Sequence, residues 1–395
     1  METFLAFTIV GVVTGAIYAV AASGLVVTYT TSGIFNFAHG AIGMFMAFTY
    51  WELRVNQHWP APLALLVVLL VLSPLLGAVI ERVLMRPLYN APMTVTIVVT
   101  LALLLILLQV ATAIWSPQEG RRLPEFFAGS DIQLAGVRVT YHQLITLGVA
   151  GLIAAFLRFF MFHTRTGVTM RAVVDNRGLA GLNGVYPERA AQLSWALGAV
   201  LAAIAGILIA PTITMNHILL TLLVVNGYAA AMLGRLRNLP LTFLGALILG
   251  LAQSYLIGWG GRFSLGTFRL IDAAQVVPTV FLFLIVVFLP QVRLAAGRLV
   301  GATAPRVPQL KASLGWSAVF IAGLVLCTTA LSEFWLFNVG AALVIGIVML
   351  SLVLLSGYAG HISLMQMTFV GMGALTAGRL VGTGSVWGIL AAGAV

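Results

Sequence analysis

Long uncharged apolar runs constrain this chain more than any other feature. Residues 60–80 and 91–115 contain no charged side chain, and each run exceeds the roughly 18 residues that mark a membrane-spanning helix. Charged residues make up 8% of the sequence and hydrophobic residues 61%, whereas a soluble domain has about 25% charged residues. The composition therefore excludes a soluble globule and predicts an all-α polytopic membrane protein.

The apolar segments predict about 12 transmembrane helices. They are expected at about 3–24, 34–51, 62–81, 94–115, 142–162, 190–213, 217–234, 240–258, 272–290, 314–331, 336–356 and 361–378. Asp, Glu, Lys and Arg are absent from the middle of every predicted span. Proton pumps and many ion-coupled carriers place such a residue at membrane depth, so we expect the energy for any transport to come from outside this chain.

Basic residues are concentrated on one predicted face of the membrane. The connections near 82–93, 158–189, 235–238 and 291–313 hold thirteen of the 20 Lys and Arg residues but only three of the ten acidic ones. By the positive-inside rule these connections are cytoplasmic and the N-terminus is extracytoplasmic. The same placement explains the net charge of +10 without a nucleic-acid partner, which would need basic and aromatic residues clustered on one exposed face.

One internal repeat is visible at a constant offset along the chain. Residues 33–48 align with residues 360–375, and both copies would cross the membrane in the same direction, which indicates parallel repeats. Two homologous subunits fused in one chain would give this pattern. The corresponding domains are a first module at 1–290 with about nine spans, a cytoplasmic Arg/Pro linker at 291–313 and the start of an incomplete second module at 314–395.

Polar side chains stand within the repeated segment. Asn36 and His39 are three residues apart and would share a helix face, and the repeat places Ser363 and Gln366 at the equivalent positions. Residues 30–33 could interrupt the preceding helix and free backbone groups for polar partners. Two interpretations are open: these side chains line a substrate path, or they form interhelical hydrogen bonds that hold two helices together.

A long cytoplasmic connection, 165–184, mixes apolar residues with arginines. A helix that lies along the membrane surface and docks a cytosolic partner has this pattern. A plain positive-inside loop explains the arginines but explains the interspersed apolar residues less well. The candidate docking residues are Arg171, Asp175, Arg177, Leu179, Leu182 and Gly184.

Small residues recur at every fourth position within the predicted span 190–213. They are Ser194, Gly198, Ala202 and Gly206. A ridge of small side chains lets a second helix approach closely in a membrane. We therefore expect helix packing along this ridge, with a role in lining a path as the lesser alternative.

Several chemistries are excluded because their motifs are missing. A phosphate-binding loop needs Gly-Lys-Ser/Thr, but the single lysine, Lys311, stands between Leu310 and Ala312. The chain has one cysteine and no His-Glu-x-x-His or Gly-x-Ser-x-Gly motif, so neither a cysteine metal cluster nor a hydrolase site is expected. We predict no metal site, no cofactor and no enzymatic activity.

Four linked segments of the first module suggest a family. They are 36–40 (Asn-Phe-Ala-His-Gly), 80–82 (Ile-Glu-Arg), 86–88 (Arg-Pro-Leu) and 167–184. Together they resemble the first permease subunit of the branched-chain amino acid ABC importers. Residues 356–366 resemble the opening of the second permease subunit of the same system. The likeness covers nearly all of 1–290 and again about 335–395.

The resemblance implies an importer without its own motor. In this family two homologous permease subunits enclose the path, cytosolic ATP-binding cassette subunits drive it, and an extracytoplasmic solute-binding protein delivers branched-chain or related small amino acids. It further implies a multi-pass location in the bacterial cytoplasmic membrane, in contact with lipid, an ATPase docking site in the loop 171–184, and a second permease chain as a further partner. The alternative is a channel or an ion-coupled secondary transporter for a small neutral solute such as urea or an amide, which would need an ionisable coupling site.

Overall fold

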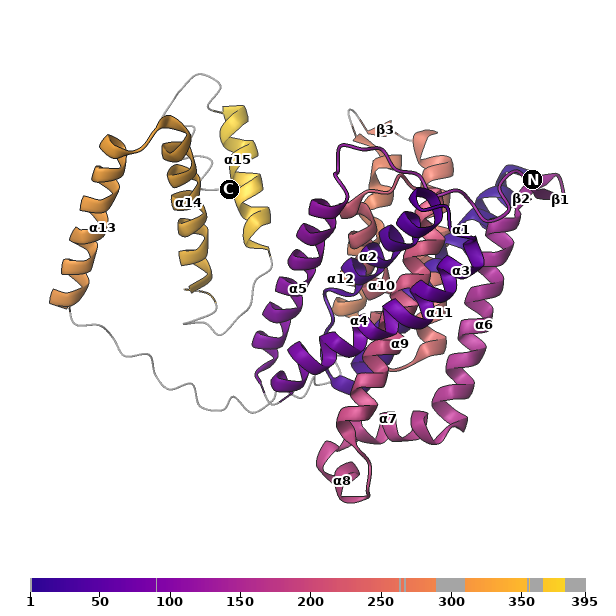
Figure 1. Ribbon diagram of the computed structural model, residues 1–395. Coiled ribbons are helices and arrows are strands. Elements are labelled where there is room, and N and C mark those ends of the chain that lie inside the picture. Colours follow the sequence, from indigo (N-terminus) through magenta and orange to yellow (C-terminus); the bar gives the residue numbers. More distant parts are fainter. Residues whose placement is uncertain are drawn as a thin grey trace. The chain divides into compact units, whose positions relative to one another are not determined.

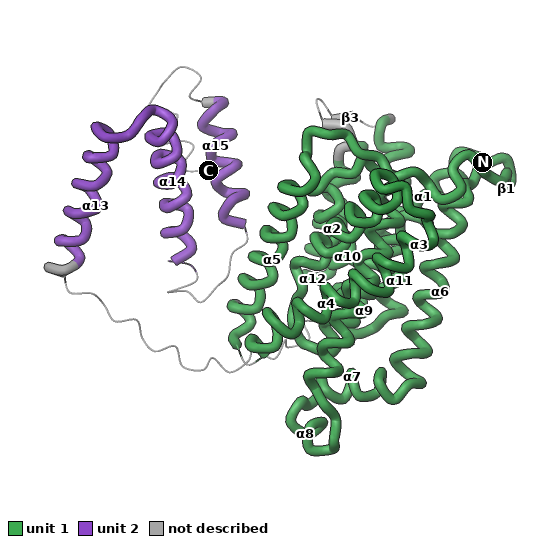
Figure 2. The backbone as a smooth tube through the Cα atoms, in the orientation of Figure 1, with its two compact units in different colours: residues 1–298 green, residues 299–395 purple. Residues whose placement is uncertain are grey.

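The computed structural model describes residues 2–89, 91–262, 264–265, 268–288, 310–353, 355 and 365–380. The chain divides into two compact units, Met1–Arg298 and Leu299–Val395, which are coloured separately in Figure 2. Most of the predicted linker lies outside the described residues, since the description stops at 288 and resumes at 310.

The first unit is a helical bundle (Figure 1). Its helices are α1 (Glu2–Ser32), α2 (His39–Trp51), α3 (Ala61–Leu66), α4 (Ser73–Ile80), α5 (Met93–Ile114), α6 (Tyr141–His163), α7 (Arg165–Asp175), α8 (Arg177–Leu182), α9 (Pro187–Ile209), α10 (His217–Leu233), α11 (Leu239–Trp259) and α12 (Val277–Phe288). Short 3₁₀ turns occur at Arg86–Leu88, Ala210–Thr212, Gly260–Arg262 and Leu270–Gln275.

Eight helices among the described residues are long and apolar enough to cross a membrane. They are Glu2–Ser32, Ala61–Leu88, Val95–Ile114, Tyr141–His163, Pro187–Thr212, Leu239–Trp259, Ser313–Ala330 and Glu333–Leu352. The apolar helices α10 and α12 are shorter, and α2 has 13 residues. The prediction of a helical multi-pass membrane protein is therefore confirmed with eight candidate spans, and the larger count of about 12 stays a prediction.

Glycines set the packing of the central helices. α1 lies against α11 where Gly11 and Gly15 face Gly250, and a Cβ atom added at Gly250 would collide with the backbone of α1. Only glycine permits so close an approach between two helices. The outer helices differ, because α5 and α6 expose apolar side chains such as Leu105 and Phe159. An apolar outer face of this kind suits contact with lipid.

The long helix between residues 61 and 88 contains two π-helical turns. They are Val67–Leu72 and Glu81–Met85, and a third π-helical turn, Glu52–Asn56, extends α2. In the turn at Glu81–Met85, the backbone N–H of Arg86 bonds to the carbonyl oxygen of Glu81, five residues earlier. Such turns are rare and often mark functional positions.

Two short antiparallel hairpins lie outside the helices, and the hydropathy pattern did not predict them. The strand pairs are β1 (Asp131–Leu134) with β2 (Val137–Thr140), and β3 (Ser264–Leu265) with β4 (Phe268–Arg269). The first hairpin turns at Ala135 and Gly136, whose φ angles are 50° and 84°. Two consecutive positive φ angles are typical of a type I′ turn. Both hairpins fall in connections that the charge distribution assigns to the extracytoplasmic face.

The described part of the second unit consists of three helices. They are α13 (Leu310–Ala330), α14 (Glu333–Leu352) and α15 (Gln366–Leu380). Large apolar residues of α14, including Phe334, Trp335 and Phe337, are exposed. Helices that are apolar all round need lipid or other helices around them, so this unit has the surface of a membrane-embedded element.

Candidate functional site

The chain between α1 and α2 leaves the helical conformation inside the bundle. Residues 33–38 are not helical, and the break starts at Gly33, whose φ of +70° is in the left-handed region that glycine tolerates. The hydroxyl of Thr100 on α5 donates to the carbonyl oxygen of Phe35 at 3.2 Å. The predicted span 34–51 therefore becomes a shorter helix that begins at His39, with a non-helical lead-in held by a neighbouring helix.

Contacts place this break deep in the bundle. His39 lies against Gly24 of α1, and a Cβ atom at Gly24 would come within 2.5 Å of the His39 ring. The same Cβ would be 3.1 Å from Leu201, near the middle of α9. Gly40 packs on Thr221 and Val224, near the middle of α10. Because α9 is long and apolar enough to cross a membrane, its contacts with the start of α2 indicate a position at membrane depth.

Polar atoms at the break lack hydrogen-bond partners within the described part of the chain. The side chain of Asn36 is 3% exposed and its Oδ1 is unpartnered. His39 is 1% exposed, and neither ring nitrogen forms a hydrogen bond of normal geometry. The backbone carbonyl of Ala21 is the group near enough to accept weakly from the ring. No side chain caps the N-terminus of α2. Buried polar groups without partners are costly in a membrane interior, so this region has hydrogen-bonding capacity that helix packing alone leaves unused.

Tyr228 of α10 adds to this polar region, and the sequence analysis missed it. Its ring packs on Phe37 with centroids 5.4 Å apart and on Phe35 at 6.5 Å. Its hydroxyl is buried without a partner among the described residues. Only the fold reveals this residue, because nothing in the sequence links 228 to the segment 33–38.

The equivalent residues of the second repeat are only partly described. Ser363 lies outside the described residues. Gln366 is the first residue of α15, just as His39 is the first residue of α2. His39 and Gln366, which the predicted repeat pairs, thus each begin a helix.

The small-residue ridge of α9 faces two other helices. A Cβ atom at Gly198 would collide with the Thr28 methyl group of α1, and one at Gly206 would come within 2.5 Å of the Gly43 carbonyl oxygen of α2. Ser194 and Ala202 are also buried. The ridge thus holds α9 against the two helices that flank the break.

The candidate docking segment forms two short helices rather than one. α7 ends at Asp175, and the Asn176 side chain caps α8 by accepting the backbone N–H of Leu179 at 3.0 Å. The inner face of α7 buries Met170 and Val173 against the bundle. Asn176 is the physical reason for the division, because a capping asparagine ends one helix and starts the next.

The outer side of this pair of helices carries the remaining docking candidates. Leu179 is 57% exposed and Leu182 is 86% exposed. The Arg171 guanidinium stacks on the Phe162 ring at 4.5 Å, and Gly184, with a φ of +79°, follows the C-terminus of α8. Figure 1 shows α7 and α8 at the end of the bundle opposite the β1–β2 hairpin. Two exposed leucines on a capped helix outside the bundle form an unpartnered apolar surface.

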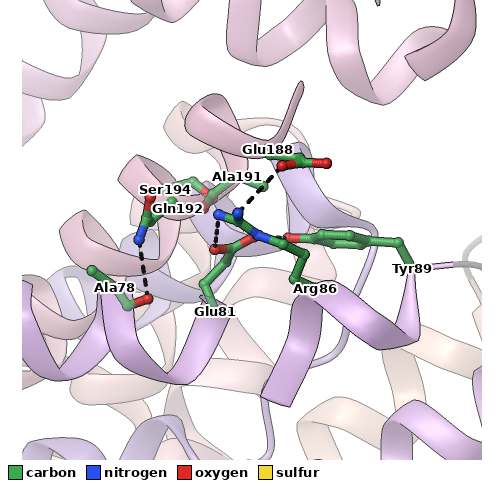
Figure 3. Close-up of polar contacts among 8 residues, drawn as sticks. All are labelled: Ala78, Glu81, Arg86, Tyr89, Glu188, Ala191, Gln192 and Ser194. Atoms are coloured by element: carbon green, nitrogen blue, oxygen red, sulfur yellow. Dashed lines mark hydrogen bonds and ion pairs between the residues drawn. The ribbon is translucent and has the colours of Figure 1, made fainter. Parts of the chain in front are cut away.

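An ion pair between a buried carboxylate, Glu81, and a partly exposed arginine, Arg86, lies beside this surface. The sequence analysis treated these residues only as part of a family motif. The Glu81 side chain is 0% exposed and accepts from Arg86 Nη2 at 2.9 Å and from the Tyr89 hydroxyl at 3.0 Å. Arg86 Nη1 also lies 3.2 Å from Glu188 Oε2 (Figure 3). The Arg177 guanidinium, at the start of α8, stacks 3.9 Å from the Tyr89 ring. Burial and the Glu81 carboxylate both raise the pKa of Tyr89, so its hydroxyl stays protonated and donates.

Comparison with known proteins adds an independent line of evidence. Residues 7–289 match the model of a family described as branched-chain amino acid transport system, permease component. The chain is 27% identical over 257 residues to the high-affinity branched-chain amino acid transport system permease protein BraD of Pseudomonas aeruginosa, covering 62% of this chain and 83% of that protein. It is 27% identical over 256 residues to the protein of the same description, LivH, of Escherichia coli K12, with the same coverage.

A third organism carries a similar protein. The probable branched-chain amino acid transport permease protein LivH of Methanocaldococcus jannaschii is 28% identical over 242 residues, or 59% of this chain and 75% of that protein. The family match covers the first unit, including the helix break and the α7–α8 pair. The chain belongs to the family of permease components of branched-chain amino acid transport systems.

Proposed function

We propose that this permease component carries a branched-chain or similar small amino acid along a path that passes the break between α1 and α2. The observation that carries the proposal is the set of unpartnered polar atoms of Asn36 and His39 at membrane depth. A zwitterionic solute with an apolar side chain needs polar partners within an otherwise apolar bundle. The relatives' names, which state branched-chain amino acid transport, support the same substrate class.

Separate ATPases are proposed to drive this transport from the cytoplasmic side. The exposed leucines of α8 offer them an apolar contact, and the arginines around α7 and α8 agree with a cytoplasmic position. This orientation leaves the N-terminus and the β1–β2 hairpin on the extracytoplasmic face, where a solute-binding protein would deliver the substrate. The absence of a phosphate-binding loop in the sequence is in line with a motor on other chains.

The second unit is proposed to begin a second permease module fused through the 291–313 linker. The support is the position of two helix starts. α2 begins at His39 and α15 at Gln366, and the internal repeat aligns these two residues. On this proposal Gln366 and Ser363 contribute to the path from the second module. A second permease chain would complete the enclosure.

The substrate class can be tested by reconstitution. Proteoliposomes that contain the permease with its ATPases and binding protein are expected to accumulate labelled leucine when ATP is supplied inside. Unlabelled isoleucine and valine should compete, whereas acetamide and urea should not. Competition by the amides with no effect of the branched-chain amino acids would contradict the proposed substrate.

Substitutions of His39 test whether the break lines the path. Glutamine keeps a donor and an acceptor of similar reach, so His39→Gln is expected to retain most uptake. Leucine removes both, so His39→Leu should lower uptake per inserted molecule by about tenfold or more, which corresponds to one lost hydrogen bond to a charged ligand group. The measurement is uptake normalised to the amount of folded protein.

A thermal melt of each His39 variant separates the two interpretations of this residue. If His39 only holds helices together, both variants should lose stability and keep equal uptake per folded molecule. That result would remove His39 from the path and leave Asn36 as the polar candidate on the same segment.

A further inference from the structure

The ion-pair network around Glu81 joins the end of the long helix 61–88 to two later, consecutive helices, α8 and α9. Glu81, Arg86 and Tyr89 belong to the end of the long helix 61–88 and its 3₁₀ turn, Glu188 to the first turn of α9, and Arg177 to the start of α8. Figure 3 shows Arg86 between the two carboxylates, with Tyr89 beside Glu81. The network therefore connects the exposed α8 to two helices of the bundle.

Burial makes the centre of this network rigid. Glu81 is enclosed and its carboxylate is held by two donors, Arg86 and Tyr89. Arg86 supplies the opposite charge, and removing it would leave a buried carboxylate without a counter-charge, which is far more costly than losing a surface contact. The Tyr89 hydroxyl is a second, neutral donor to the same carboxylate. A side chain fixed in this way transmits displacement to its neighbours rather than absorbing it.

The contact with α8 is of a different kind. Arg177 meets Tyr89 through the face of the aromatic ring, at 3.9 Å, and a stacked cation is held strongly only while the ring stays beneath it. Glu188 continues the connection on the other side, since it pairs with Arg86 at 3.2 Å and opens α9. α9 in turn packs on α1 at Gly198 and on α2 at Gly206, the two helices that flank the break.

We propose that this network couples α8 to the bundle, with Tyr89 and Arg177 as the positioning residues. A displacement of α8 by a bound ATPase would move Arg177, then Tyr89 and the Glu81–Arg86 pair, and through Glu188 the helix α9. This inference rests on the proposed docking of ATPases at α8. It assigns Tyr89 a role in coupling ATP hydrolysis to transport and no role in attaching the ATPase.

The test measures substrate transported per ATP hydrolysed in the reconstituted complex. Tyr89→Leu removes the ring and the hydroxyl, and we expect it to lower this ratio at least about fivefold, the lower range of allosteric coupling. Tyr89→Phe keeps the ring beneath Arg177 and leaves both Arg86 contacts with Glu81, so the ratio should stay within about twofold of the parent protein. The ATPase subunits should co-purify normally with both variants.

A double variant and a control make the result specific. Arg177→Gln should lower the ratio as Tyr89→Leu does, and the two changes together should be no worse than either one, because both break the same contact. Arg189→Gln is the matched control: Arg189 also stacks on a tyrosine, Tyr186, at 4.7 Å, but stands outside the network. It should transport as the parent protein does.

Three results would overturn the coupling role. They are an unchanged ratio in Tyr89→Leu, an equal loss in Tyr89→Phe and Tyr89→Leu, and loss of ATPase co-purification in Tyr89→Leu. The docking proposal fails on a separate result, namely normal ATPase binding after both exposed leucines of α8 are replaced by aspartate. The two failures are therefore distinguishable.

Discussion

Replacing both Leu179 and Leu182 with aspartate is expected to detach the ATPase subunits and abolish ATP-driven uptake. The two leucines are exposed on α8, so the variant should insert and fold as the parent protein does. In the complex, each aspartate would be desolvated against an apolar partner without a compensating charge. Each desolvated, unpaired charge costs more than an unpaired neutral group, whose cost is about 1–3 kcal/mol, so two such charges should lower the affinity at least about 100-fold.

Co-purification of the ATPases with the tagged permease measures this loss, and uptake into proteoliposomes measures its consequence. Aspartate at Ile132 and Leu134 is the matched control, because these residues are also exposed and apolar but lie on the β1–β2 hairpin at the opposite end of the bundle. The control should bind ATPases normally. ATPase binding that survives the change at Leu179 and Leu182 would place the docking site elsewhere.

Valine at Gly206 is expected to prevent stable folding of the first unit. A Cβ atom there would lie 2.5 Å from the carbonyl oxygen of Gly43, and neither backbone can retreat without moving a whole helix. Overpacking of this kind costs about 1–3 kcal/mol even where side chains can adjust, and here the obstacle is main chain. We expect a loss of properly folded protein, or a melting temperature lower by about 5 °C or more.

Gly148 is the control for this change. It also lies within a membrane-spanning helix, α6, but a Cβ atom at Gly148 would meet no atom within 4 Å. Gly148→Val should therefore melt close to the parent protein. Equal yields and melting temperatures for the two valine variants would show that α9 and α2 are not in the close contact described above.

Hydropathy and small-residue spacing were enough to predict most of the bundle. The bounds of four helices, α5, α6, α9 and α11, agree closely with the predicted spans. An uncharged run of this length forms a helix in a membrane because a helix satisfies all its backbone hydrogen bonds internally. The break before α2 was also foreseeable, since residues 30–33 end in a glycine that can adopt a positive φ. The contact of Tyr228 with this break could not be predicted, because the packing of α10 brings Tyr228 to Phe37.

The Glu81–Arg86 pair shows a second kind of limit. Residues five apart do not share a face of an α-helix, where neighbours are three or four apart, so their spacing offers no reason to pair them. The π-helical turn at Glu81–Met85 brings them together. The division of the docking segment at Asn176 could not be predicted either. It depends on one side-chain cap, which does not appear in a hydrophobic pattern.

The π-helical turns also bear on how length can vary within a membrane span. A π-helical turn holds one residue more than the α-helical turn it replaces. The extra residue is accommodated locally, and the side chains of the helix beyond it point in the same directions as before. A homologue that is one residue shorter within 67–72 or 81–85 could therefore bury the same side chains. If the missing residue fell between Glu81 and Arg86, the pair would stand four apart, which an ordinary α-helix also brings together. A single-residue gap in the middle of this span is thus compatible with an unchanged fold.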